Sequence, residues 1–149
     1  MNAEDILNRT SSQWITSLKS NEIFVFASNM EREHLGGAAR MANDKFGAVM
    51  YNPDGYQGQC YAIPTLSFKD NFFGLKDIEE HVNTFFISVK KMREEFPALY
   101  SHVVYLVTEI GCGIAGYTPE QIAPMFKEAI DLPYVHLPAR FWEVILKDQ

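Results

Sequence analysis

Short apolar runs alternate with helical patterns along the chain from residue 22 onward. Strands are predicted where these runs are rich in β-branched and aromatic residues, at 22–28, 59–63, 102–108 and 134–137. Helices are predicted from apolar periodicity and capping residues at 38–46, 75–96, 140–146 and from Thr118 onward. Such alternation predicts an α/β fold with three α/β/α layers and a mainly parallel, mixed sheet.

Single residues set several of the predicted boundaries. Residues 1–20 are expected to form an N-terminal helix packed on the domain, capped by Asn2, with three apolar residues on one face: Leu7, Trp14 and Leu18. Pro64 is expected to limit the second strand. Thr118 and Gln121 have the spacing of a capping box, and Pro124 predicts an irregularity in the helix that follows.

The composition fits a single domain over residues 1–149. Apolar residues make up 47% of the chain and charged residues 21%, as in ordinary globular proteins. We expect a cytoplasmic protein without a membrane partner, because the chain shows neither a long apolar stretch nor an apolar leader. Cys60 and Cys112 are too few for a disulfide framework or a four-ligand zinc site, and the histidines lack ligand spacing, so no metal is expected. No cofactor is expected either.

The charge balance restricts the class of ligand. Thirteen Lys and Arg against 19 Asp and Glu give a net charge of −6. That field disfavours nonspecific binding to nucleic acid. A small-molecule nucleotide is still compatible with it, since main-chain N–H groups hold phosphate without a basic surface. The composition leaves the oligomeric state open.

Five of the nine glycines lie in two loops, each between a predicted strand and a predicted helix. The later loop, from Gly111 to Gly116, fits the pattern G-x-G-x-x-G. A full dinucleotide-binding fold would need a second half after this motif, and the remaining residues are too few for one. The glycines either let main-chain amides approach a phosphate or only form a tight turn.

The earlier loop begins at Ser28 and Asn29 and reaches Gly36, Gly37 and Ala38. An asparagine at a strand end is able to hydrogen-bond a ribose hydroxyl, or it caps a turn. Since the carboxyl ends of parallel strands meet at one sheet edge, both glycine loops are expected to face one crevice.

Several further side chains have two interpretations each. Tyr117 either stacks on a base or ribose, or covers a helix N-terminus. The thiol of Cys112, beside a predicted helix N-terminus, is a candidate for a lowered pKa. Arg140 is placed where it would pair with a phosphate. Three phenylalanines between the second strand and the long helix either belong to the core or line a pocket: Phe68, Phe72 and Phe73.

Four segments of the chain together resemble a macro domain: FVFASN at 24–29, GGAA at 36–39, YAIPT at 61–65 and IGCGIAGY at 110–117. The chain resembles most the small terminal ADP-ribose glycohydrolase type, and it is also similar to phage and prophage macro-like proteins. The resemblance implies binding of ADP-ribose or a related nucleotide in a crevice between the two glycine loops. It implies these ligand-binding residues: Ser28, Asn29, Gly36, Gly37, Ala38, Thr65, Gly111, Cys112, Gly113, Ile114, Ala115, Gly116 and Tyr117.

Two departures from that pattern bear on catalysis. Leu66 stands where the glycohydrolase type has its attacking Lys, and Ala115 stands where it has an Asp. Binding is therefore expected ahead of hydrolysis by a known route. One alternative is an ADP-ribosyl or N-glycosyl hydrolase that uses an acid in the first loop, with three catalytic candidates: Glu31, Glu33 and His34. The others are a phage-type protein that sequesters or degrades an ADP-ribose-derived immune signal, and an interaction module with purely structural glycine loops.

Overall fold

The computed structural model describes residues 1–30, 37–50, 52–69 and 72–147. Within these ranges six strands form one sheet in the order β1-β6-β5-β2-β4-β3. The strands are, in chain order, β1 (Thr10–Ser11), β2 (Glu22–Asn29), β3 (Gly55–Gln57), β4 (Cys60–Leu66), β5 (Val104–Val107) and β6 (Val135–Pro138). All neighbours are parallel except β3, which pairs antiparallel with β4. The expected α/β fold with a mainly parallel, mixed sheet is confirmed.

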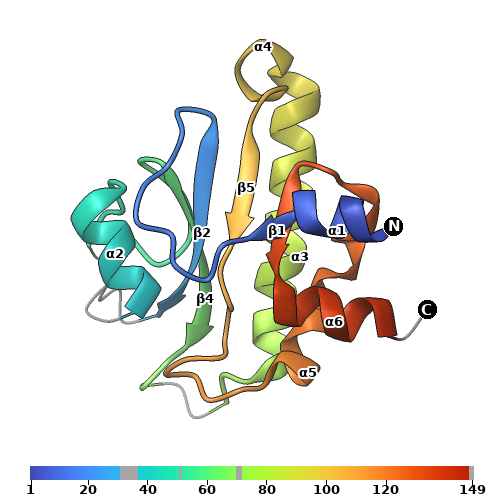
Figure 1. Cartoon of the computed structure of the whole chain (residues 1–149). Helices are drawn as coiled ribbons and strands as arrows, with labels where there is room; N and C mark the ends of the chain where they lie inside the picture. Colours follow the sequence, from blue (N-terminus) through green and yellow to red (C-terminus); the bar gives the residue numbers. More distant parts are fainter. Residues whose placement is uncertain (31–36, 51, 70–71, 148–149) are drawn as a thin grey trace.

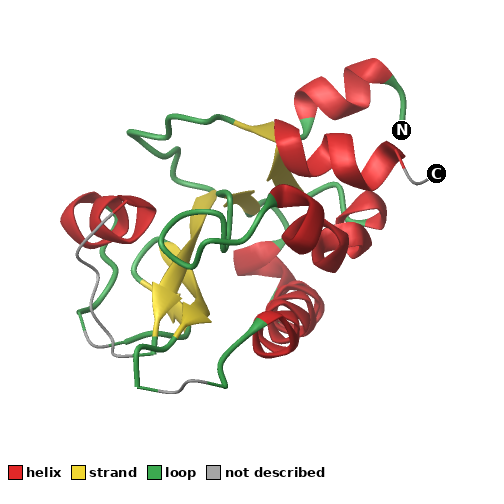
Figure 2. Ribbon diagram, turned by 90° about the horizontal axis from the view of Figure 1, so that it is seen from below, coloured by secondary structure: helices red, strands yellow, loops and turns green. Residues whose placement is uncertain are grey.

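Helices cover both faces of this sheet (Figures 1 and 2). They are α1 (Ala3–Asn8), α2 (Gly37–Lys45), α3 (Leu75–Glu95), α4 (Pro97–Tyr100), α5 (Pro119–Ile122), the 3-10 helix η1 (Ala123–Asp131) and α6 (Ala139–Lys147). Figure 2 looks onto the ends of the strands, with α2 on one side of the sheet and α3 on the other.

The sheet topology explains why α2 and α3 lie on opposite faces. The chain passes from β2 through α2 to its neighbour β4, and then returns through α3 to β5, on the other side of β2. Crossover connections between parallel strands are right-handed in nearly all proteins. Two crossovers that proceed in opposite directions along the sheet therefore place their helices on opposite faces.

The core consists of two clusters, one on each face of the sheet. Phe24 and Phe26 of β2 pack with Ala39 and Ala42 of α2, whereas Val25 belongs to the cluster on the α3 face. Successive residues of a strand point to opposite faces, so a central strand needs apolar residues at every position. This burial on both faces explains the continuous apolar runs in the sequence.

The predicted N-terminal helix over residues 1–20 is wrong beyond Asn8. Asn2 does cap α1, but Thr10 and Ser11 form a strand at the open edge of β6 instead of continuing the helix. Trp14 is 79% exposed, and the apolar residues that follow it, Ile15 and Leu18, pack on the α2-face cluster. Pairing at an exposed sheet edge has taken precedence over local helical periodicity.

Of three further predictions from single residues, two are confirmed and one is wrong. The expectation that Pro64 limits the second strand is wrong, because β4 continues through Pro64 to Leu66. The missing N–H of Pro64 is tolerated because β3 pairs only with Cys60–Ala62 and leaves that end of β4 open. The capping box is confirmed, since the amide of Thr118 donates to Gln121 Oε1 at 3.0 Å. The irregularity at Pro124 is also confirmed, because the helix changes from α to 3-10 at Ala123.

Candidate functional site

A cavity of about 540 Å³ lies at the carboxyl ends of the central strands β2, β4 and β5. Small-molecule sites in proteins span about 300–1,000 Å³, so this volume is sufficient for a nucleotide. The lining comes from these strand ends, from the start of α2 and from the loop at 108–118. The predicted site residues that the structure brings together here are Ser28, Asn29, Gly37, Ala38, Thr65, Gly111, Cys112, Gly113, Ile114 and Ala115.

The cavity position follows from the topology. The connection after β2 turns toward β4, whereas the connection after β5 continues toward β6, so the two loops diverge at the β2/β5 boundary. Ligands of open α/β sheets bind at such a point, where the order of the strands reverses. The two glycine loops therefore flank one cavity for a reason that belongs to the fold.

The loop after β5 is shaped by hydrogen bonds between its own main-chain groups. The amide of Gly116 donates to Gly113 O and that of Tyr117 donates to Gly111 O, both at 3.0 Å. Within the described ranges, the amides of the intervening residues Gly113, Ile114 and Ala115 donate no hydrogen bond. Three successive donors of this kind are typical of main-chain sites for anions.

The two central glycines of this loop have different surroundings. Gly111 has φ +77°, and a Cβ atom there would lie 3.0 Å from Ile122 Cδ1. Gly113 does not have a positive φ, and a Cβ atom there would meet no atom within 4 Å. Gly111 is therefore required by the fold, whereas Gly113, which lines the cavity, is not constrained by neighbouring atoms.

The opposite wall of the cavity comes from β2 and α2. Asn29 ends β2, and Gly37, Ala38 and Ala39 form the first turn of α2. Gly37, Ala38 and Ala39 have no side chain or a small one, which would let a ligand come close to the main chain. Residues Glu31, Glu33, His34 and Gly36, which the sequence placed in the intervening loop, lie outside the described residues.

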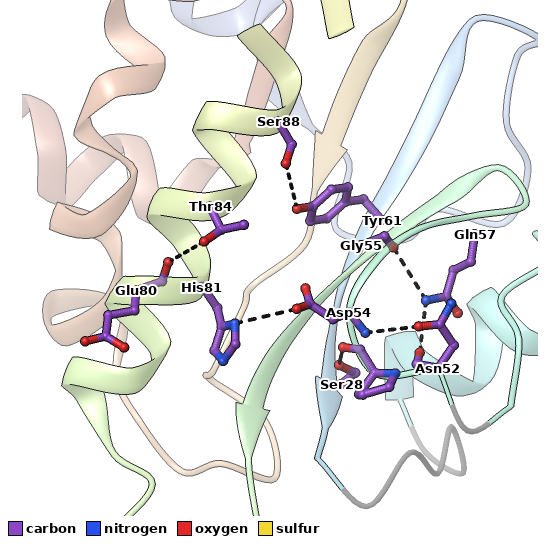
Figure 3. Close-up of polar contacts among 11 residues, drawn as sticks. Ser28, Asn52, Asp54, Gly55, Gln57, Tyr61, Glu80, His81, Thr84 and Ser88 are labelled. Atoms are coloured by element: carbon purple, nitrogen blue, oxygen red, sulfur yellow. Dashed lines mark hydrogen bonds and ion pairs between the residues drawn. The ribbon is translucent and has the colours of Figure 1, made fainter. Parts of the chain in front are cut away.

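The hydroxyl groups at the strand ends donate hydrogen bonds to main-chain carbonyls of neighbouring segments. Ser28 donates to the carbonyl of Pro53, beside the turn that precedes β3 (Figure 3). Thr65 donates to Ser28 O at 3.3 Å, and Thr108 donates to Val25 O at 2.8 Å. A register shift between β2 and β4 at Ser28 and Asn29 accompanies these bonds. These hydroxyl protons are engaged within the protein, so toward a ligand Ser28 and Thr65 would act as acceptors.

The expected lowering of the Cys112 thiol pKa is wrong. Burial, and then the negative charge of Glu109, raise the pKa of Cys112 to about 11. The positive charge of Arg140 opposes this shift and does not reverse it. Cys112 is therefore a neutral thiol on the cavity wall at physiological pH.

Glu109 is the one charged residue on the described lining of the cavity. Its carboxylate accepts two hydrogen bonds from Arg140, from Nε at 2.6 Å and from Nη2 at 2.7 Å. Arg140, which the sequence suggested for a phosphate, is thus paired with this carboxylate. The sequence analysis missed Thr108 and Glu109. These two residues directly follow β5, in a position similar to that of Asn29 at the end of β2, so a survey of polar residues at all strand ends would have found them.

The aromatic candidates are distributed differently from one another. Phe68 lines the cavity and is 64% exposed, whereas Phe72 is 94% exposed and is not on the lining. Phe73 packs on the α3-face core and stacks on His81. Tyr117 also packs on that core, and neither it nor Gly116 lines the cavity.

Neither a search for metal sites and membrane-spanning helices nor a comparison with known proteins assigns a function. In the described ranges no group of three or more His, Cys, Asp or Glu side chains is placed to hold a metal ion. No helix in those ranges is both long enough and apolar enough to cross a membrane. Comparison with protein-family models, curated proteins and solved structures finds no match to this chain. The functional conclusion therefore depends on the cavity and its lining.

Proposed function

We propose that this protein has a three-layer, macro-domain-like fold and binds ADP-ribose or a related ADP-ribose-derived nucleotide in the cavity. The observation that carries the proposal is the row of unpartnered main-chain amides at Gly113, Ile114 and Ala115, on a cavity at the strand-order reversal. Such amides bind a diphosphate with neutral donors, which suits a chain of net charge −6.

The remaining lining fits the other parts of such a ligand. Asn29 ends β2 on the lining of the cavity, and its amide side chain is the one that we propose to hydrogen-bond a ribose. Gly37 and Ala38 would let that ribose approach the main chain. The exposed apolar side chains of Phe68 and Ile114 would pack on the flat base.

Binding is proposed ahead of turnover because the described lining lacks a ready catalytic group. Glu109 is paired with Arg140, and Cys112 is a neutral thiol. The positions that carry Lys and Asp in the glycohydrolase type are Leu66 and Ala115, and both line the cavity.

Substitution of Gly113 by Val tests the assignment of the amide row. A Cβ atom at Gly113 would meet no protein atom within 4 Å, so we expect the valine variant to keep the fold while its side chain blocks the approach of a diphosphate to the amide row. We expect affinity for ADP-ribose to fall more than about tenfold, since hydrogen bonds to a charged group are lost. The melting temperature without ligand is expected to stay within about 2 °C of the wild type.

The measurement is isothermal titration calorimetry with ADP-ribose, its cyclic isomers, NAD, ADP and AMP. Gly113→Ala is the graded control, because a methyl group takes up less of the cavity. Unchanged ADP-ribose affinity in Gly113→Val would contradict the diphosphate assignment. Failure of every nucleotide to bind the wild type would leave the loops with a structural role alone.

A further inference from the structure

Glu109 and Arg140 reach each other because of where their strands end. Strands β5 and β6 are parallel neighbours, and they end at Val107 and Pro138. Glu109 and Arg140 are each the second residue after their strand, so the sheet brings both to the same edge. The resulting pair is bidentate, which is the strongest geometry between a guanidinium and a carboxylate.

This pair decides the charge that the cavity presents. Glu109 would otherwise place a negative charge on the wall that carries the amide row. Glu120, at the start of α5, adds a second carboxylate within electrostatic range of Cys112 and Arg140. Among the described lining residues no lysine or arginine offsets them, so Arg140 supplies the positive charge from outside the lining.

We infer that Arg140 is a specificity-determining residue, which allows the cavity to accept an anionic ligand by neutralising Glu109. This inference rests on the proposed nucleotide function and adds a requirement for a negatively charged ligand. Glu109 is in this view a liability that Arg140 cancels, and it makes no contact with the ligand. The main-chain amides hold the phosphate, and the ion pair removes the repulsion that would oppose it.

Three variants separate this role from its alternatives: Arg140→Gln, Glu109→Gln and the double variant Glu109→Gln/Arg140→Gln. Arg140→Gln leaves Glu109 uncompensated, so affinity for an anion is expected to fall about fivefold. Glu109→Gln leaves Arg140 unpaired, so affinity is expected to equal or exceed that of the wild type. The double variant is neutral at both positions and is expected to return close to wild-type affinity.

The probes are ADP-ribose and inorganic pyrophosphate, each measured by calorimetry at low and high salt. The differences among variants are expected to shrink as salt screens the charges. Lys90→Gln is the matched control, because it removes one positive charge from an exposed ion pair with Glu128 that does not line the cavity. No change in either affinity is expected for this control.

Other patterns would overturn the inference. If all three variants weaken binding alike, the pair only clamps the loop to α6. If Glu109→Gln and the double variant weaken binding whereas Arg140→Gln does not, Glu109 contacts the ligand. If pyrophosphate binds, with affinities that follow the expected order among the wild type and the variants, but ADP-ribose does not bind, the nucleotide function fails and the charge requirement stands. If ADP-ribose binds but the variants do not follow the expected order, the nucleotide function stands and the role of Arg140 fails. If neither probe binds the wild type, both proposals fail.

Discussion

At the scale of single residues, Gly111 and Gly113 belong to the same motif for different physical reasons. The positive φ of Gly111 and the side chain of Ile122 beneath it make this glycine a requirement of folding. Gly113 meets neither constraint and borders the cavity. A pattern match treats the two positions alike, and only their surroundings separate the role in folding from the role proposed in binding.

Cys112 gives a prediction about chemical reactivity. With a pKa of about 11, about one thiol in a thousand is ionised at a pH of about 8. We expect alkylation by iodoacetamide to be about a hundredfold slower than for an unperturbed thiol at that pH. The rate should rise until the pH approaches the pKa of Cys112, and mass spectrometry of quenched samples measures it.

The unfolded protein provides the control for this experiment, since both of its thiols lie in water. Cys60 is fully buried and its pKa is raised to about 12, so it is expected to react even more slowly in the folded protein. Rapid labelling of Cys112 near neutral pH would show that the helix N-terminus dominates over burial and Glu109.

At the scale of elements, length separates what could be predicted from what could not. The 21-residue helix α3 and the strands β2 and β5 bury apolar residues in clear patterns, and the sequence located all three. Strand β1 has two residues and β3 has three, which is too short for any periodicity. Their existence depends on open sheet edges at β6 and β4, and these edges form only in the folded protein.

The candidate site shows the same division. Residues at strand ends and in glycine loops were predicted to share a crevice, because parallel strands align their carboxyl ends. The engagement of the Ser28 hydroxyl, the pairing of Glu109 with Arg140 and the raised pKa of Cys112 were out of reach. Each depends on distances between segments that lie far apart in the sequence.

The junction between α2 and the β3–β4 turn gives a prediction about stability. Gly58 has φ +55°, and a Cβ atom there would lie 2.6 Å from the carbonyl carbon of Gly47, just after α2. Because main chain meets main chain, neither segment has a side chain that could move aside. We expect Gly58→Ala to lower the free energy of unfolding by about 2–4 kcal/mol.

Gly55→Ala is the matched control for this substitution. Gly55 also has a positive φ, of +83°, but a Cβ atom there would meet nothing within 4 Å. The strained backbone alone is expected to cost about 1 kcal/mol. Urea denaturation measures both variants, and equal losses would contradict the close approach at Gly58.

At the scale of the whole molecule, buried phenols and thiols make stability depend on alkaline pH. Burial raises the pKa of Tyr56, Tyr105, Cys60 and Cys112, and the Tyr56 and Tyr105 hydroxyls are 2.7 Å apart. In the unfolded chain the pKa of such thiols is about 8.5 and that of phenols is about 10. The folded protein thus holds more protons than the unfolded chain above these values, and stability falls as the pH rises.

The stabilisation is fully present below about pH 8 and is lost as the pH rises toward about 11–12. Urea denaturation at a series of pH values measures this loss. Tyr56→Phe removes one of the titrating groups, so its stability is expected to fall less steeply than that of the wild type above about pH 10. A free energy of unfolding that stays constant over this range would contradict the burial of these groups.

The row of main-chain amides after β5 has a consequence for mutational tolerance. An amide donor is present whatever side chain its residue carries, proline excepted. Replacement of the Ile114 side chain, which is 78% exposed, would change the apolar contact proposed with the base but would leave the N–H of this residue in place. A phosphate site made of main-chain amides would depend on the path of the chain, so it would withstand divergence of sequence that removes a site made of side chains.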